Sequence, residues 1–240
     1  MIPISDEGGR RRRFPIVTIL IIAVNAVVFL YQMSLGSREL QQTVFAYGVV
    51  PLEITTGRDL PPRIPFPIEV TLITSMFMHG GWLHIIGNMM YLWVFGDNIE
   101  DALGPFLFPA FYVVTGFAAA FTQIFTDPTS QTPSIGASGA VAGVLGGYLL
   151  LHPTNRVNSL LIFGFFIRTI QLPAFVVLGF WFIMQLFSGV ASLGVEDVGV
   201  AYWAHIGGFV AGVLLMLPVA LFTGVRDRQR RGPYLEYGDR

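Results

Sequence analysis

Four polar residues stand near the starts of three apolar segments of this sequence. Ser138 opens the segment SGAVAGVLGGYLLL, His205 lies in YWAHIGG, and His84 and Asn88 lie in WLHIIGN. A serine hydroxyl becomes a nucleophile when a base within hydrogen-bond reach accepts its proton, and a histidine imidazole can be that base. The residue types therefore suit acyl transfer, provided that three separate helices bring them together.

Acyl transfer also needs hydrogen-bond donors for the oxyanion that forms on the attacked carbonyl group. His84 and Asn88 are four residues apart, so they share one face of a helix, and both side chains can donate. Unpaired backbone N–H groups at the start of a helix beginning at Ser138 add further donors. Because the sequence has no Asp or Glu between Asp127 and Glu196, we expect a Ser-His dyad rather than a triad.

The composition indicates a membrane protein. Of the 240 residues, 53% are hydrophobic and only 12% are charged, too few charges to cover a soluble globule of this length. The net charge of −1 gives no reason to expect a nucleic-acid partner. The absence of cysteine excludes disulfides, thiolate zinc sites and a cysteine nucleophile.

Six apolar runs predict an all-α membrane domain of six transmembrane helices. We expect a basic cytoplasmic N-terminus at 1–13, the membrane domain at 14–223 and a solvated C-terminal tail at 224–240. Residues 35–78 form the one long loop of this arrangement, and Arg168 and Pro173 interrupt the fifth run. The predicted helices cover residues 14–34, 82–101, 105–125, 138–151, 169–188 and 203–223.

The arginines predict the orientation, because basic residues favour the cytoplasmic side of short flanking segments. Eleven of the 14 arginines lie on one side if both termini are cytoplasmic, and the other three, in the 35–78 loop, lie outside. Only the turn at 96–104, with three acids and no arginine, fits poorly. The second, fourth and sixth helices then all start at the outer face. We therefore expect the polar cluster to lie toward the outside. As a separate expectation, we take the membrane to be a prokaryotic plasma membrane.

Two stripes of small residues predict close contact between the fourth and sixth helices. Gly139, Gly143 and Gly147 are spaced at four residues, as are Ala204, Gly208 and Gly212. This small-xxx-small pattern lets helix backbones approach closely in a membrane. The stripes begin beside Ser138 and His205, so this packing would bring the hydroxyl within reach of the imidazole.

Three motifs together resemble the rhomboid family of intramembrane serine proteases. They are the HxxxxHxxxN pattern of His79, His84 and Asn88, the GASG of Gly136 to Gly139, and the AHxxGxxxG of Ala204 to Gly212. The resemblance extends over about residues 70 to 215. It implies a six-helix bundle, open to water on its outer side, that cleaves transmembrane protein substrates among the membrane lipids without a cofactor or metal.

The same resemblance implies a role for each matching residue. Ser138 would be the nucleophile, and His205 the base and then the acid. Asn88, His84 and the backbone N–H of Ser138 would form the oxyanion hole, with Gly136 in the same substrate-binding group. His79 we place at the membrane interface, where it would orient the loop, without a catalytic role.

The sequence departs from the family in two places. Some rhomboids carry an aromatic residue four positions after the nucleophile, which stacks on the catalytic histidine, whereas this chain has Ala142. The Trp-Arg pair often found in the first outer loop is also missing, although Arg63 and Glu69 lie in that region. What orients His205, and what anchors the first loop, are therefore open questions at this point.

Two other functions are compatible with a small polar cluster in a membrane protein. One is a rhomboid-like pseudoprotease that binds transmembrane helices without cutting them, although a pure binder needs neither Ser138 nor His205. The other is a channel or transporter, against which the inner halves of the helices offer no polar relay and no inverted repeat is visible. For the protease, we expect the fifth helix and the outer loop at 188–200 to act as the substrate gate.

Overall fold

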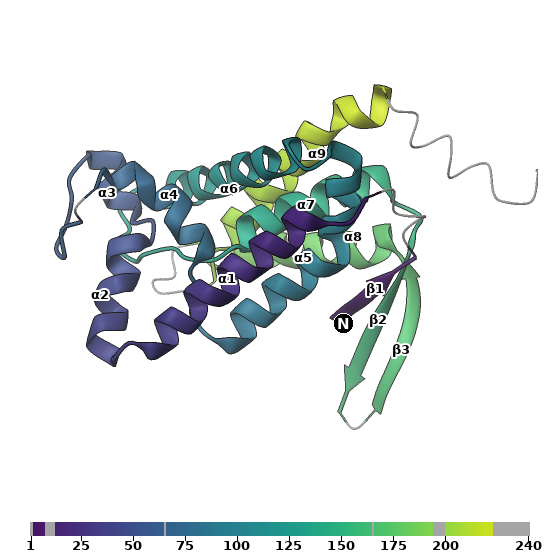
Figure 1. The fold of residues 1–240 in the computed structure, drawn as a ribbon, viewed down its shortest axis with the longest axis horizontal. Coiled ribbons are helices and arrows are strands. Elements are labelled where there is room, and N and C mark those ends of the chain that lie inside the picture. The colour runs from purple at the N-terminus through teal and green to yellow at the C-terminus, as the bar shows by residue number, and fades with distance from the viewer. Residues whose placement is uncertain (1, 8–12, 65, 165, 194–199, 223–240) are drawn as a thin grey trace, which may run out of the picture.

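A computed structural model describes residues 2–7, 13–64, 66–164, 166–193 and 200–222. Its long helices form a bundle with α7 in the middle (Figure 1), and most residues of α7 are buried. The helices of 14 or more residues are α1 (Ile16–Ser34), α5 (Trp82–Leu103), α6 (Leu107–Thr126), α7 (Ser138–Leu151), α8 (Ala174–Ala191) and α9 (Tyr202–Phe222).

The prediction of an all-α chain is wrong, because the region before α8 is a β-hairpin. Strands β2 (Arg156–Phe163) and β3 (Phe166–Pro173) pair antiparallel, and β1 (Ile2–Asp6) pairs antiparallel with β2. The apolar run that predicted a helix from residue 169 is therefore divided at Pro173, after which α8 begins. In the hairpin Arg168 is exposed, which suits its charge.

The sheet ties the chain's N-terminal strand to the connection between α7 and α8. Since β1 pairs with β2, residues 2–6 and 156–163 lie at one end of the bundle (Figure 1), the arrangement that the predicted orientation requires. The opposite end is built from the 35–78 segment, which is folded. It contains α2 (Ser37–Tyr47), α3 (Pro51–Thr56), η1 (Ile68–Val70), α4 (Thr71–Thr74) and η2 (Ser75–Phe77).

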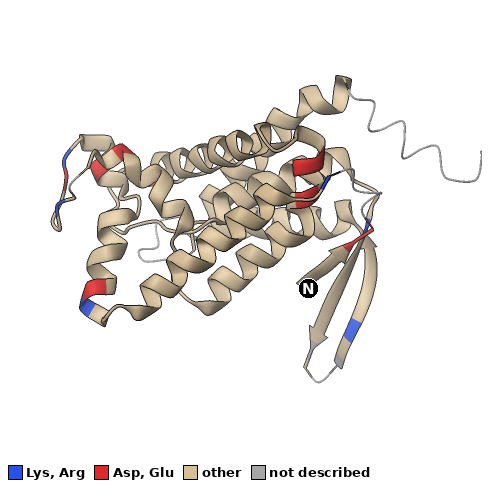
Figure 2. Cartoon of the chain, viewed as in Figure 1, with Lys and Arg blue, Asp and Glu red and all other residues tan. Residues whose placement is uncertain are grey.

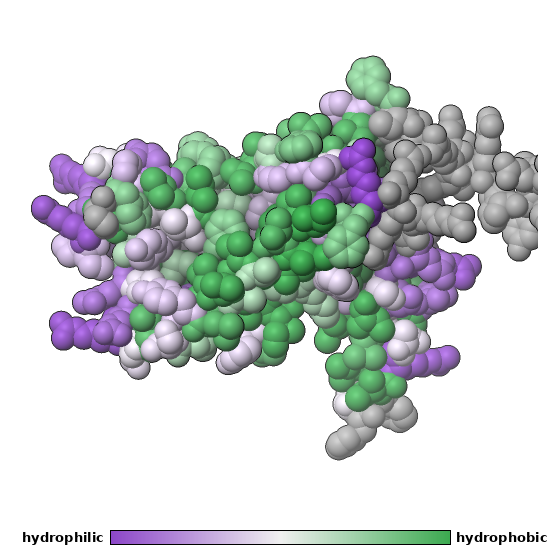
Figure 3. Space-filling model, viewed as in Figure 1, coloured by the Kyte–Doolittle hydropathy of each residue, from purple (hydrophilic) through white to green (hydrophobic). Residues whose placement is uncertain are grey.

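The distribution of charge divides the molecule into two polar ends and an apolar middle. Charged residues gather at the ends of the bundle and on the hairpin (Figure 2), and hydrophobic side chains cover much of the visible surface between the ends (Figure 3). Within the described part of the chain, four helices, α1, α6, α8 and α9, are long and apolar enough to cross a membrane. The protein is therefore an integral membrane protein whose middle faces lipid.

Glu100, one of the three acids of the 96–104 segment, has a structural role at the end of α5. Glu100 is buried and accepts hydrogen bonds from the backbone N–H groups of Val17 at 2.9 Å and Thr18 at 2.8 Å. The Thr18 hydroxyl donates a third bond to the same carboxylate at 2.7 Å. A carboxylate at the positive N-terminal end of α1 is favourable, which explains an acid here without reference to membrane orientation.

Helices α7 and α9 pack with their backbones in contact, as the small-residue spacing predicts. A Cβ atom added at Gly208 would overlap the carbonyl oxygen of Gly139, and one added at Gly212 would overlap that of Gly143. Backbone atoms cannot move aside as a flexible side chain can. Only glycine at these two positions allows this distance between the helices.

We predict that Gly212→Ala forces α7 and α9 apart. Overpacking of this kind costs about 1–3 kcal/mol, and the melting temperature of the detergent-solubilised protein, followed by tryptophan fluorescence, should fall. Gly179→Ala on α8 is the matched control, because a Cβ atom there has nothing within 4 Å. Equal melting temperatures for the two variants would contradict the packing argument.

Candidate active site

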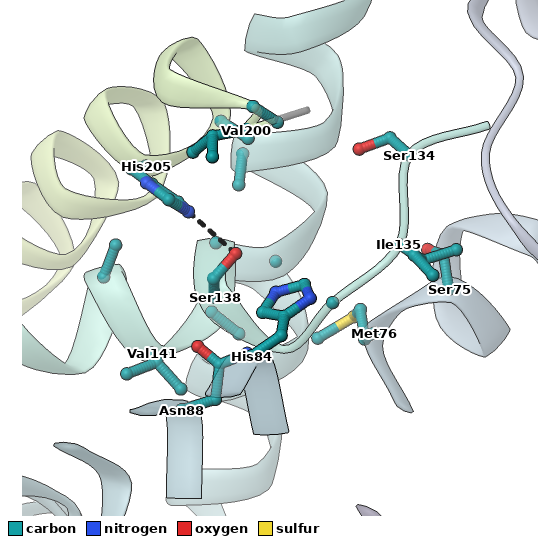
Figure 4. Close-up of a pocket in the computed structure, with 18 of the residues that line it drawn as sticks. Ser75, Met76, His84, Asn88, Ser134, Ile135, Ser138, Val141, Val200 and His205 are labelled. Carbon is teal, nitrogen blue, oxygen red and sulfur yellow. Dashed lines mark hydrogen bonds between the residues drawn. The ribbon is translucent and has the colours of Figure 1, made fainter. Parts of the chain in front are cut away.

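The structure brings Ser138 and His205 together. The Ser138 hydroxyl oxygen lies 2.8 Å from Nε2 of His205, and the two side chains point toward each other (Figure 4). Ser138 is the first residue of α7 and His205 lies in the first turn of α9. The close packing of these helices therefore sets the distance between the two groups.

The segment that leads into α7 is held by the folded 35–78 region. Val49 and Ser134 exchange backbone hydrogen bonds of 3.0 and 2.8 Å, and the N–H of Gly136 donates to the carbonyl oxygen of Ser75 at 2.9 Å. These bonds fix the backbone that precedes Ser138. The first helical bond of α7 runs from Val141 to the carbonyl of Ala137, so the N–H groups of Ser138 to Ala140 precede it.

Gly136 makes room for His84 beside the serine. Its φ of 131° lies in a region that favours glycine, and a Cβ atom there would be 2.7 Å from Nε2 of His84 and 3.5 Å from the Ser138 hydroxyl oxygen. Nδ1 of His84 accepts a hydrogen bond from the N–H of Gly80 at 3.3 Å. The proton of a neutral ring is then on Nε2, which faces the serine as a donor.

His79 holds the Asn88 side chain by a hydrogen bond, a role that the sequence reasoning did not foresee. His79 is 1% exposed, and Gln32 of α1 bonds both its N–H and its carbonyl oxygen. The amide nitrogen of Asn88 lies 3.0 Å from Nε2 of His79. Burial, and then the neighbouring His84, lower the pKa of His79 to about 4, so at neutral pH its uncharged ring accepts this bond.

A cavity of about 790 Å³ is lined by Ser138, His205, His84 and Asn88. His84 and Asn88 lie on the side of Ser138 away from His205 (Figure 4), so the serine is flanked by a base on one side and by donors on the other. The lining also includes Trp181 of α8 and Ala201 just before α9. The cavity is large enough for water and for a short length of extended peptide.

A glutamine that the sequence reasoning missed contacts the second ring nitrogen of His205. Oε1 of Gln185 lies 2.8 Å from Nδ1, and the ring of Trp181 lies beside the imidazole, tilted by 36° with a centroid distance of 5.9 Å. Both residues belong to α8. The sequence did contain a feature that could have identified Gln185. It is the one amide in the apolar helix α8, and polar groups at membrane depth are suspected functional residues.

Comparison with known proteins assigns the family. The sequence model of the rhomboid domain family matches residues 69–222, which is more than half of the chain. The chain belongs to the rhomboid family. The matched range contains Ser138, His205, His84 and Asn88.

Several curated rhomboids are similar to this one. Rhomboid protease GluP of Bacillus subtilis is 28% identical over 88% of this chain and 37% of its own length. Rhomboid protease AarA of Providencia stuartii is 27% identical over 85% of this chain and 72% of its own. Rhomboid protein 1, mitochondrial, of Saccharomyces cerevisiae is 29% identical over 68% of this chain and 45% of its own. The chain spans less than half the length of several relatives that it matches.

We predict that Gly136→Ala displaces His84 from the serine, because the added methyl group would overlap its ring, and that a protease activity at this site would fall with it. Loss of one oxyanion donor lowers kcat by about 10²–10³-fold, which cleavage of a transmembrane model substrate would measure. Gly57→Ala is the control for backbone strain. Gly57 also has a positive φ, of 66°, but lies in open space in the 35–78 region, so its substitution should leave cleavage unchanged; equal losses in both variants would contradict the prediction.

Proposed function

We propose that this protein is an intramembrane serine endopeptidase that cleaves transmembrane segments of other membrane proteins. The observation that carries the proposal is the 2.8 Å hydrogen bond between the Ser138 hydroxyl and Nε2 of His205 beside a cavity. Relatives named as proteases, GluP and AarA, support the same activity. A nucleophile and base at this distance are the working parts of acyl transfer.

The first half of the reaction forms an acyl-enzyme. The Ser138 oxygen attacks the scissile carbonyl carbon while Nε2 of His205 takes the hydroxyl proton. The tetrahedral intermediate then collapses, the C–N bond breaks, and the protonated His205 gives its proton to the leaving amine. In the second half a water molecule repeats the attack on the ester, with His205 again as base and then as acid.

The oxyanion is proposed to bind between α5 and the start of α7. The backbone N–H of Ser138 and Nε2–H of His84 face this space, and the Asn88 amide supplies a third donor. The bond from Asn88 to His79 uses one of its two amide protons, which leaves the other for the substrate. Each such donor stabilises the transition state by about 2.7–4 kcal/mol.

A helical substrate must unwind before it can be cut, because helix hydrogen bonds shield its carbonyl groups. We propose that the substrate enters from the lipid past α8, at the side of the cavity where Trp181 lies. Residues 194–199 of the outer loop, which we also expect to take part in the gate, lie outside the described residues. Small or helix-breaking residues in the substrate would make unwinding easier.

We further propose that the site opens toward the outside of a prokaryotic plasma membrane and that both termini are cytoplasmic. The arginine distribution supports this orientation. The similar proteins include bacterial and mitochondrial rhomboids, among them GluP and the yeast protein. The tail at 224–240 lies outside the described residues.

The main alternative is a rhomboid-like protein that binds transmembrane helices without cleaving them. A binder needs no hydrogen bond between a serine and a histidine, and no glycine that admits a histidine beside the serine. Both features are present here, at Ser138 and at Gly136. They favour the protease.

The proposal predicts that purified protein in proteoliposomes cleaves a transmembrane model substrate, and that Ser138→Ala and His205→Ala do not. A fluorophosphonate should label wild type and leave Ser138→Ala unlabelled, because the reagent forms a bond with an activated serine. Cleavage by all three proteins alike would overturn the catalytic assignment. Folded wild type that neither labels nor cleaves any of a broad panel of substrates would favour the binding protein.

The gate proposal makes a separate prediction. A disulfide engineered between α8 and α5 on the cysteine-free background should block cleavage in proteoliposomes while leaving fluorophosphonate labelling of Ser138 intact. The small reagent does not require passage of a helix, whereas the substrate does. Reduction of the disulfide should restore cleavage. Full cleavage by the crosslinked protein would show that α8 is not the gate.

A further inference from the structure

We propose that Gln185 is a positioning residue for the catalytic base, holding His205 in the tautomer and orientation in which Nε2 accepts the proton of Ser138. This inference rests on the proposed function and deepens it. It answers the question raised by Ala142, because Gln185 and Trp181 of α8 contact the histidine from the neighbouring helix.

The two ring nitrogens of His205 have different partners. Nε2 lies 2.8 Å from the Ser138 hydroxyl and Nδ1 lies 2.8 Å from Oε1 of Gln185. An amide oxygen only accepts hydrogen bonds, so Nδ1 must carry the ring proton and donate it. Nε2 is then unprotonated and able to take the serine proton. With the opposite tautomer, the base would face the serine with an N–H group and would not work.

The neutral amide takes the place that a carboxylate occupies in a catalytic triad. Among the described residues that line the cavity there is no Asp or Glu. When His205 takes the proton, both its nitrogens become donors, and the amide oxygen stabilises the charged ring through a hydrogen bond. The net contribution of a hydrogen bond to a charged group corresponds to a rate effect of about 10- to 100-fold.

The position of Gln185 within α8 supports a role directed at the site. Trp181 and Gln185 are one helical turn apart and both face His205, whereas Ile183, Met184 and Phe187 are exposed on the lipid side. An amide costs free energy in an apolar helix unless it is hydrogen-bonded. The only polar neighbour that the structure pairs with Oε1, among the described residues, is the imidazole of His205.

The fully buried Ala142 fits the same arrangement. In rhomboids with an aromatic residue at this position, the ring that stacks on the histidine comes from the helix of the nucleophile. Here Ala142 is 0% exposed, and Trp181 of α8 supplies the ring contact. In this chain the contacts that orient the histidine therefore come from α8 instead of α7, and Gln185 adds a hydrogen bond that a ring contact alone does not provide.

The test compares substitutions at Gln185 in the full-length protein in proteoliposomes. Gln185→Met keeps the length of the side chain and removes the acceptor, so kcat should fall by about 10- to 100-fold with KM little changed, which corresponds to the loss of one hydrogen bond to a charged ring. Gln185→Glu keeps an acceptor and should restore most of the activity. Ile183→Met is the matched control, since it introduces the same residue on the lipid side of α8.

Recovery of kcat in Gln185→Glu distinguishes two roles of Gln185. One is to position His205, and the other is only to hold α8 against α9. If Gln185 only holds the helices together, Gln185→Met should lower the melting temperature and should raise KM, and the acceptor in Gln185→Glu should not restore kcat. That pattern, or wild-type kcat in Gln185→Met, would overturn the proposal. Fluorophosphonate labelling of Ser138 should slow in Gln185→Met by a factor similar to that for kcat, because the small reagent does not depend on the gate.

An NMR measurement keeps the inference testable if the protein proves not to be a protease. With 15N-labelled histidine, the His205 resonances, assigned by their loss in His205→Ala, should show Nδ1 protonated and Nε2 unprotonated in wild type. The preference should weaken in Gln185→Met. Absence of cleavage with this tautomer present would reject the proposed function alone, whereas a protonated Nε2 in wild type would reject the role of Gln185.

Discussion

The backbone contact between α7 and α9 is the constraint on which the rest of the site depends. Gly208 and Gly212 lie against the carbonyl oxygens of Gly139 and Gly143, where any side chain would force the helices apart. Lipid does not drive two apolar helices together as water does, so close van der Waals contact must supply the attraction. Because Ser138 begins one helix and His205 lies in the first turn of the other, this contact also sets the distance between hydroxyl and imidazole.

A short central helix and the folded 35–78 segment together place a polar site beside lipid. Helix α7 has 14 residues and spans about 21 Å at 1.5 Å per residue, less than the ~30 Å of a hydrocarbon core. Its first residue therefore lies below the membrane surface if its other end reaches the opposite interface. Val49 and Ser75 complete the wall above it by binding Ser134 and Gly136. The resulting cavity lets polar groups and water meet at a depth where lipid alone would exclude both.

The sequence was sufficient for those parts of the fold and site that depend on spacing within one segment. The glycine stripes predicted the α7 and α9 contact, and five of the six predicted helices agree with the structure to within three residues. The hairpin was missed because the apolar run that precedes α8 has the composition of a membrane helix, and strand pairing with residues 2–6 is a long-range property. Gln185 was overlooked for a similar reason. Its function depends on which neighbour α8 faces, and α8 meets His205 only through the packing of three helices.

The groups that orient His205 lie on the same helix that we propose as the gate, so substrate entry and activation of Ser138 are linked. Gln185 and Trp181 both belong to α8, the helix past which we propose that substrate enters. An outward displacement of α8 large enough to admit a helix would carry Oε1 beyond hydrogen-bond distance of Nδ1, since such bonds weaken steeply past about 3.2 Å. The base would then lose its orienting contacts while the cavity is open to lipid. Return of α8 would restore them. If the protein is the protease proposed above, the serine would become fully nucleophilic only after the substrate is enclosed, so that the hydrogen bond from His205 to Gln185 would couple entry to activation.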